Sequence, residues 1–498
     1  MDQSRAPLFE ALLEHHRRRP VSFHVPGHKS AARQIWTDLD ASAHSFFKDV
    51  LNIDLTEIAG LDDIHQPEGV IREAEQLAAQ CFGAERTFFL VNGSTAGNLA
   101  MILAHCGPGD LLIVQRDVHK SVIHGLMLAR ARAVFVSPLI DERSGLAVGV
   151  EPAALKQALD AYPEAKGVLL VRPNYYGMAG DLKALVQLVH ASGKPVFVDE
   201  AHGAHLGFHE EIPPSALTAG ADVVVQSTHK MLRSMTMGSM LHVQGSLAKP
   251  GEIRKFLSIL QTTSPSYPIM ASLDLARRDM HMYGREQIEK GLEAVRLFAA
   301  GMSGLPWFEL VSDKAGNQAG RIKDPFKVIV ADRTGTFSGY SLQSELERRG
   351  CMAEMADLRH VLLVFSPFST YGHAEKLLRA FNRISGDYKL QKKELQNQAT
   401  NNIGTNLQLN VISSPVSFDA HNGSQPLSLH TVGLTEAEDA VSAEMVVPYP
   451  PGVPVLYPGE RINGTHIRYL RKLSEAGARF HGVKDAKLQT IEVYFENS

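Results

Sequence analysis

The stretch that decides the fold is ADVVVQSTHKMLRSMTMGSMLH, residues 221–242. Its β-branched run, Val223 to Val225, is typical of a buried parallel strand. A polar cluster ends the strand and is followed at once by Lys230. Burial favours the neutral form of a lysine, and only the neutral amine attacks a carbonyl. A lone lysine in such a position more often simply reaches solvent, so the hypothesis that Lys230 forms a Schiff base depends on the rest of the chain.

The composition is that of an ordinary globular protein. A chain of 498 residues is too long to fold around a single hydrophobic core, so we expect two or three domains. The net charge of −4 disfavours a nucleic-acid partner. The N-terminus has no signal-peptide pattern and no stretch is long and apolar enough to cross a bilayer, so we expect no membrane partner. Three cysteines without disulfide or zinc spacing agree with a reducing, cytoplasmic location.

Strand and helix patterns alternate along the first half of the chain. Predicted strands cover 87–91, 111–114, 133–136, 167–171, 195–198 and 223–225, and predicted helices cover 7–19, 70–82, 119–130, 152–161 and 182–192. This alternation of strands and helices predicts an α/β fold with a mainly parallel sheet. Ligands of such folds bind at the carboxyl ends of the strands. Five candidate positions fall at such ends: 93–95, His119, Tyr175, Asp199 and Lys230.

The turn at residues 92–98, NGSTAGN, joins a predicted strand to a predicted helix. Its exposed amides, hydroxyls and helix dipole would make an anion site, although a simple helix cap explains the pattern equally well. The turn is neither a Walker A loop nor a dinucleotide-binding turn. The sequence DEAH at 199–202 suggests a helicase, but a helicase needs an upstream Gly-Lys-Thr loop that this chain lacks. A Pro-Gly turn separates His24 from His28, so we expect no metal site.

Several motifs in a fixed order carry a resemblance to a known family. GST at 93–95, VDEAHGAH at 198–205 and QSTHKML at 226–232 resemble fold-type I enzymes that use pyridoxal 5'-phosphate (PLP). The flanking motifs narrow this resemblance to the Orn/Lys/Arg decarboxylase family, in its short biosynthetic type. They are FHVPGHK at 23–29, GLDDIHQPEG at 60–69, FFLVNGSTAGN at 88–98, LQTTSPSYPIMASLD at 260–274 and PYPPGVPVLYPGE at 448–460.

The resemblance implies a role for each residue around the cofactor ring. Lys230 forms the covalent link to PLP, and Asp199 pairs with the pyridinium nitrogen. His119 stacks on one face of the ring, with Ala201 against the other face. His229 lies over the substrate carboxylate and helps to protonate the carbanion that decarboxylation leaves. The chemistry agrees, because a protonated ring can delocalise that charge.

The resemblance also implies how the cofactor phosphate is held. Ser94, Thr95 and Ser227 bind it, and Thr263 or Ser264 is added from a partner subunit. Because the hydroxyls of the stretch TTSPSY at 262–267 have no obvious local partner, we expect an obligate homodimer, which could assemble further.

The family acts on arginine, lysine or ornithine, so the substrate is expected to be a small basic amino acid. A guanidinium favours a planar, bidentate carboxylate partner, and an ammonium needs only a point contact. Glu460 is the first candidate, because a proline-rich loop can hold a carboxylate rigidly. Glu354, Asp357, Asp62 and Asp63 are the alternatives. We expect conversion of arginine to agmatine in polyamine biosynthesis, with lysine or ornithine decarboxylation as alternatives.

Two further functional hypotheses remain open from the residues alone. The first keeps the cofactor but changes the reaction to transamination or aldol cleavage, with Arg277 or Arg278 holding the substrate carboxylate of an aminotransferase. The second is a PLP-loaded regulator without catalysis, which the absence of a basic helix-turn-helix pattern disfavours.

The sequence predicts five segments. They are an N-terminal arm (1–65), a PLP-binding major domain (66–300), a small α/β domain (301–390), a polar linker (391–440) and a C-terminal domain (441–498). The linker is assigned because it is rich in Asn, Gln and Ser and has little periodicity.

Overall fold

A computed structural model describes residues 1–29, 41–311, 322–390, 411–418, 428–449 and 452–495. The chain forms two compact units. The first unit contains Met1–His105, Phe197–Phe208 and Pro214–Arg285, and the second contains Cys106–Val196, His209–Pro213 and Glu286–Ser498. In the described part of the chain, no helix has the length and apolar character needed to cross a membrane.

Four strands meet side by side in the first unit, in the order β1-β8-β7-β6. They are β1 (Arg86–Leu90), β6 (Val196–Asp199), β7 (Val223–Gln226) and β8 (Ser239–Val243). β6 and β7 are parallel, with Phe197 opposite Val223. β8 is antiparallel to both β7 and β1. β1 and β7 therefore run in the same direction, and their carboxyl ends lie at the same edge.

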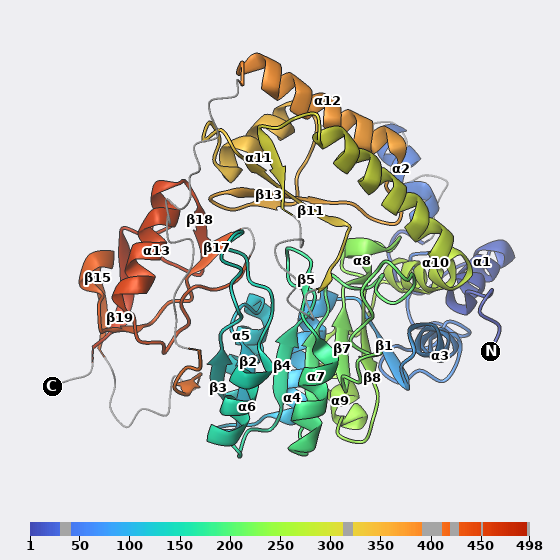
Figure 1. The fold of residues 1–498 in the computed structure, drawn as a ribbon. Helices are drawn as coiled ribbons and strands as arrows, with labels where there is room; N and C mark the ends of the chain where they lie inside the picture. The colour runs from blue at the N-terminus through green and yellow to red at the C-terminus, as the bar shows by residue number, and fades with distance from the viewer. Residues whose placement is uncertain (30–40, 312–321, 391–410, 419–427, 450–451, 496–498) are drawn as a thin grey trace. The chain divides into compact units, whose positions relative to one another are not determined.

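Helix α4 (Gly93–His105) begins directly after β1 and packs on β1, β7 and β8 (Figure 1). Gly97 allows this close approach. A Cβ at this position would lie 2.9 Å from a methyl carbon of Leu90 and 2.9 Å from a methyl carbon of Val225, which real Cβ atoms do not tolerate. Gly93 has a φ of +74°, a left-handed conformation that favours glycine. The two glycines fix the start of α4 beside the ends of β1 and β7.

A buried ion pair in the first unit holds the N-terminal segment against helix α10 (Tyr267–Met302). Arg277 is fully buried and pairs with Asp274 at 2.5 Å. Its guanidinium also donates to the carbonyl oxygens of Gln3 at 2.8 Å and Arg5 at 2.6 Å. Asp274 accepts a further bond from the backbone N–H of Leu8. Arg277 is thus committed to structure, and the hypothesis that it binds a substrate carboxylate is wrong.

Five other helices belong to the first unit. They are α1 (Pro7–Arg18), α2 (Ala41–Leu51), α3 (Val70–Phe82), α8 (Thr228–Met231) and α9 (Pro250–Leu260). α3 packs on α1 and on β1, and α9 packs on α4. The spacing of apolar residues in α3 gives it one buried face, and Gly83, with a φ of +78°, ends the helix.

The strands β4, β2, β3 and β14 of the second unit lie in this order and are mainly parallel. The strands are β2 (Leu111–Gln115), β3 (Arg132–Val136), β4 (Val168–Val171) and β14 (Val416–Ser417), and the helices between them are α5 (Lys120–Ala129), α6 (Pro152–Ala161) and α7 (Leu182–Ala191). β2 is parallel to both β3 and β4, and β14 is antiparallel to β3. The ends of β2 and β4 lead directly into polar loops.

The remaining strands of the second unit form smaller antiparallel sheets (Figure 1). One sheet has the order β12-β13-β11-β9 and is covered by α11 and α12; a second has the order β15-β19-β16. Their bounds are β9 (Phe308–Leu310), β11 (Lys327–Asp332), β12 (Met355–Ala356), β13 (His360–Val364), β15 (Leu429–Gly433), β16 (Val441–Ser442), β19 (Thr490–Tyr494), α11 (Gly339–Arg348) and α12 (Tyr371–Asp387). Two strand pairs, β5 (Met178–Ala179) with β10 (Ile322–Lys323) and β17 (Val447–Tyr449) with β18 (Arg479–His481), and helix α13 (Gly464–Glu475) complete the unit.

The structure confirms the predicted alternation and corrects it in places. The predicted helices at 70–82 and 152–161 are α3 and α6 with the same bounds, and the predicted strands lie within about two residues of the observed ones. The sequence pattern also predicts a long helix over 285–302, and the observed helix α10 begins already at Tyr267. The polar segment 391–440 contains the strands β14 and β15, which its composition did not indicate. Residues 391–410 and 419–427 of this segment lie outside the described residues.

We predict that Glu75 makes the first unit less stable at alkaline pH. Its buried carboxyl accepts a bond from the N–H of Phe89 at 3.0 Å and lies 3.6 Å from the Arg254 guanidinium. Burial raises its pKa from the ordinary 4.5 to about 7 despite this partner. Its contribution to stability is therefore full below pH 4.5 and is lost as the pH rises through 7. We therefore compare the free energy of unfolding of Glu75→Gln with that of the wild type. The difference, variant minus wild type, should be about 2 kcal/mol more favourable to the variant at pH 8 than at pH 5.5.

Denaturant unfolding at the two pH values measures this difference. Glu73→Gln, on the more exposed side of α3, is the matched control and should show no comparable pH dependence. An equal effect of Glu75→Gln at both pH values would show that the carboxyl is not protonated in the folded protein.

Candidate active site

Lys230 lies at the carboxyl end of β7, in the short helix α8. Its side chain is half-buried, and its Nζ is 3.0 Å from Nε2 of His202. Its backbone N–H donates to the carbonyl oxygen of Ser227, which closes the turn out of the strand. The predicted lysine is thus held at a strand end beside an imidazole nitrogen with which its amine can exchange a proton.

Asp199 ends β6, next to β7, and only 4% of its surface is exposed. One carboxylate oxygen accepts a bond from Nδ2 of Asn98 at 2.8 Å, and the other accepts one from the N–H of Ala201 at 3.0 Å. These two donors fix the orientation of the carboxylate and leave further lone pairs for a ligand N–H. Sequence reasoning assigned no role to Asn98, although it lies within the NGSTAGN turn.

The hydroxyls predicted to hold a phosphate meet at the same edge. Ser227 follows β7, Ser94 stands in the first turn of α4, and the Ser227 hydroxyl donates to the Ser94 hydroxyl at 2.8 Å. Thr95 is exposed beside them. Hydroxyls together with the free N–H groups of a helix N-terminus are a suitable donor set for a phosphate. The residues present therefore fit the phosphate, ring nitrogen and aldehyde of PLP.

The histidine that precedes the lysine is also fixed by its surroundings. The Nδ1–H of His229 donates to the carbonyl oxygen of Gly238 at 3.1 Å, so its other nitrogen, Nε2, is free to accept a proton. Burial lowers the pKa of His229 below its ordinary value, although the bond to Gly238 opposes the shift. Ala201 is buried, and its carbonyl accepts a bond from the N–H of Ser227.

Thr263 and Ser264 lie in the turn before α10 and are exposed. The neighbouring Thr262 carbonyl is bound by the ring of His65 at 3.0 Å, which anchors the turn in the first unit. Exposed hydroxyls on an anchored turn suit a contact with another subunit, and the role of both residues stays a prediction.

His119 belongs to the second unit, where it precedes α5 as its N-cap. Its Nδ1 accepts a bond from the N–H of Ser121 at 3.2 Å, which orients the ring at the end of β2. Its stacking on the cofactor ring stays a prediction.

Glu460 is buried in the second unit and has a local partner. Its carboxylate pairs with the guanidinium of Arg116 at 2.7 Å and also accepts a bond from the N–H of Tyr457. The same guanidinium lies 4.8 Å from the centre of the Tyr457 ring. Burial raises the pKa of Glu460, while Arg116 opposes that shift. Arg116, a partner that the sequence did not indicate, fixes the position of the Glu460 carboxylate, and the role of Glu460 at the substrate tail stays a prediction.

The alternative substrate carboxylates differ in their surroundings. Asp62 caps α3: although burial alone would raise its pKa, bonds from backbone N–H groups, among them those of Glu68 and Gly69, lower it. Asp63 accepts the N–H of His65, and Glu354 is exposed. Asp357 lines a cavity in the second unit. Asp62 is therefore a structural residue of its loop.

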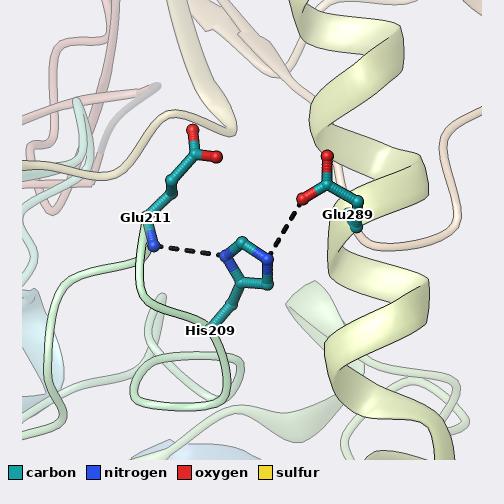
Figure 2. A group of neighbouring side chains, drawn as sticks. All are labelled: His209, Glu211 and Glu289. Atoms are coloured by element: carbon teal, nitrogen blue, oxygen red, sulfur yellow. Dashed lines mark hydrogen bonds and ion pairs between the residues drawn. The ribbon is translucent and has the colours of Figure 1, made fainter.

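A group of one histidine and two acids in the second unit has the composition of a metal site (Figure 2). The Nδ1 of His209 accepts a bond from the N–H of Glu211, so its Nε2 carries the proton and faces Glu289 at 3.1 Å. Arg296 pairs with Glu211 at 2.5 Å and with Glu289 at 2.7 Å. A metal would have to displace Arg296 and change the tautomer, so we assign this group to holding segment 209–213 against α10.

Two protein-family models match this chain. The family model for the Orn/Lys/Arg decarboxylase major domain matches residues 6–312, and that for the Orn/Lys/Arg decarboxylase C-terminal domain matches residues 415–494. The arginine decarboxylase of Bacillus subtilis (strain 168) is 36% identical over 499 residues, which cover 100% of this chain and 99% of that protein.

Two solved structures show the fold. Lysine decarboxylase A from Pseudomonas aeruginosa superposes with a TM-score of 0.80 at 22% identity, covering 98% of this chain and 80% of that chain. A structure described as SPT with PLP superposes with a TM-score of 0.51 at 18% identity, covering 64% and 77%. The predicted fold-type I class, with a mainly parallel sheet and a separate C-terminal domain, is confirmed. With the two family models and the full-length relative, the chain belongs to the Orn/Lys/Arg decarboxylase family and is a decarboxylase.

Proposed function

We propose that this enzyme uses PLP to convert L-arginine to agmatine and CO₂, as a step of polyamine biosynthesis. The observation that carries the proposal is the set formed by Asp199, Lys230 and the bonded pair Ser94–Ser227 at strand ends of the first unit. The full-length relationship to an arginine decarboxylase supports the choice of substrate.

Each residue in the first unit has a proposed task. Lys230 binds the cofactor covalently, and Asp199 holds a proton on the ring nitrogen. Ser94, Thr95 and Ser227 hold the phosphate, and Ala201 packs on the ring. PLP, when bound, supplies an electron sink for the carbanion that loss of CO₂ leaves. The chain's own share is to orient the breaking bond and to exclude water from it.

Proton transfer is assigned to histidines. The Nδ1–H of His229 is bound to Gly238, so its Nε2 is the atom that holds and delivers a proton. His202, 3.0 Å from the Lys230 amine, is suited to take a proton from that amine so that it can react. His119 is proposed to stack on the ring from the second unit.

We further propose a cytoplasmic homodimer in which Thr263 or Ser264 of one subunit completes the phosphate site of the other. The exposure of both hydroxyls on an anchored turn supports this arrangement. Cys81, Cys106 and Cys351 form no disulfide in the described part of the chain, which agrees with a reducing location.

One test of this proposal concerns the covalent link. Borohydride reduction of the purified enzyme should abolish its visible absorbance and leave a reduced pyridoxyl group on the peptide that contains Lys230. Lys230→Ala should lower CO₂ release by roughly three orders of magnitude or more, because covalent catalysis is lost. Lys255→Ala, on the exposed face of α9, is the control and should retain both the band and the activity. An unmodified Lys230 peptide would refute the assignment.

A second test concerns the substrate. Measured kcat/KM should favour arginine over lysine and ornithine by at least about tenfold, the value of one charge-assisted bond. If Glu460 binds the guanidinium, Glu460→Gln should reduce kcat/KM for arginine more than for lysine, because a bidentate contact is lost. The same change also breaks the buried pair with Arg116 and should destabilise the fold by about 3 kcal/mol.

Tyr457→Phe separates the two effects. It removes the bond from the Tyr457 hydroxyl to the carbonyl of Arg116 but leaves the Glu460 carboxylate in place. This control should keep the preference for arginine over lysine. A preference of the wild type for lysine or ornithine would refute arginine as the substrate. Unchanged selectivity in Glu460→Gln would show that Glu460 does not bind the cationic group of the substrate.

A further inference from the structure

The second unit contains a cavity of about 270 Å³. Its walls come from the loops that follow β2 and β4, from the β12-β13 sheet and from the C-terminal helix α13. The residues that matter here are Asp117, Asp357 and the tyrosines Tyr176, Tyr340 and Tyr469. The volume is slightly below the range of about 300–1,000 Å³ typical of drug-sized ligands, so it suits a small molecule.

Asp357 places a negative charge at this cavity. Its carboxylate accepts bonds from the backbone N–H groups of Arg359 and His360, from Nδ1 of His360 and from the hydroxyl of Tyr176. Burial opposes ionisation, but these contacts lower the pKa of Asp357. Since the Tyr176 hydroxyl donates to the carboxylate, its oxygen is a strengthened acceptor for an N–H from a ligand.

Asp117 is a second carboxyl in the same wall, and its Oδ1 accepts a bond from the side-chain amide of Gln115 at 2.7 Å. Burial raises the pKa of Asp117, and the amide bond only partly offsets this. Among the described residues, no lysine or arginine lies within ion-pair distance of Asp117 or Asp357. Asp117 and Asp357 are half-buried. A carboxylate that is partly withdrawn from water and has no cation is destabilised, and a cationic ligand would stabilise it.

The two arginines at the cavity do not supply this compensation. Arg116 is neutralised by Glu460, with which it forms a close pair. Arg359 is exposed to solvent and donates to the carbonyl oxygen of Arg143. Among the described lining residues, His360 is the remaining basic group, and its Nδ1 lies 3.0 Å from the Asp357 carboxylate. Asp117 is therefore the carboxyl of this cavity that has no basic partner in the described part of the chain.

The aromatic walls favour the same kind of ligand. The faces of Tyr340 and Tyr469 can stack on a guanidinium or ammonium group. Burial, with a contribution from the Asp357 charge, raises the pKa of Tyr340 to about 12, so its hydroxyl stays neutral and can bond to a ligand. Burial, with a contribution from the Asp357 charge, also raises the pKa of Tyr469. Asp357, Tyr340 and Tyr469 therefore share one electrostatic environment.

We propose that this cavity binds a small aliphatic amine with a cationic group at each end, and that agmatine, the product of the decarboxylation, is such a ligand. One cationic end pairs with Asp117 and the other lies among the tyrosines next to Asp357. The amino acid substrate is a poorer ligand, because its α-carboxylate would enter a region that already carries two carboxylates. The identity of the natural ligand rests on the proposed function; the charge preference does not.

The test is equilibrium binding by calorimetry to borohydride-reduced enzyme, whose covalent site is blocked. Agmatine and arginine methyl ester, which lack a free carboxylate, should bind at least tenfold more tightly than arginine. Asp117→Asn should weaken agmatine binding at least tenfold, and Tyr469→Leu should weaken it as well. Asp332→Asn is the matched control. Like Asp357, Asp332 accepts bonds from backbone N–H groups, but it does not line the cavity.

Two outcomes would overturn the inference: arginine binding as tightly as agmatine, or agmatine binding that is unchanged in both Asp117→Asn and Tyr469→Leu. Circular dichroism of each variant checks that it is folded, and Tyr469→Phe, which keeps the ring, should bind better than Tyr469→Leu. Release of CO₂ from arginine is measured separately. An active arginine decarboxylase that does not bind agmatine refutes only this inference, and tight agmatine binding without decarboxylation refutes only the proposed function.

Discussion

The carboxylate of Asp199 is the constraint on which the candidate site depends. An anion that is 4% exposed needs donors at fixed positions, and the fold supplies them from two directions. Asn98 donates from α4, and the N–H of Ala201 donates from the loop that follows β6. Asn98 reaches the carboxylate because its neighbour Gly97 lets α4 lie directly on Leu90 and Val225. A side chain at position 97 would push the helix away, and the carboxylate would lose its amide partner.

Much of this arrangement could be predicted from local patterns. The β-branched run that becomes β7 and the amphipathic periods of α3 and α6 each reflect one buried face, which the sequence of a single element reveals. The rule that ligands bind at the carboxyl ends of parallel strands then placed Asp199, Ser227 and Lys230 at one edge. The bond between Ser94 and Ser227 follows from the same reasoning, because β1 and β7 run in the same direction.

The remaining features depend on partners that are distant in the sequence. Glu460 is bound by Arg116, which precedes it by 344 positions, and Arg277 holds the backbone of residues 3 and 5. Neither pairing leaves a local pattern, so the first was missed and the second was mistaken for a possible substrate contact. β8 and β14 were missed for a related reason, since short strands that pair antiparallel with a sheet have no periodicity of their own.

Buried carboxyl groups in this chain are accommodated in different ways, and the differences separate structural residues from binding residues. Asp199 has neutral donors, Asp274 and Glu460 have arginines, and Glu75 is favoured in its protonated form. In each of these cases the folded chain itself supplies the donors, the cation or the protonation, and Asp199 keeps lone pairs for a ligand N–H. Asp117 is half-buried in the wall of a cavity, where the side-chain amide of Gln115 and its own backbone N–H only partly offset the rise in its pKa that burial causes. Since folded proteins leave few buried polar groups poorly satisfied, a carboxyl of this kind indicates a ligand better than a fully paired one such as Glu460 does.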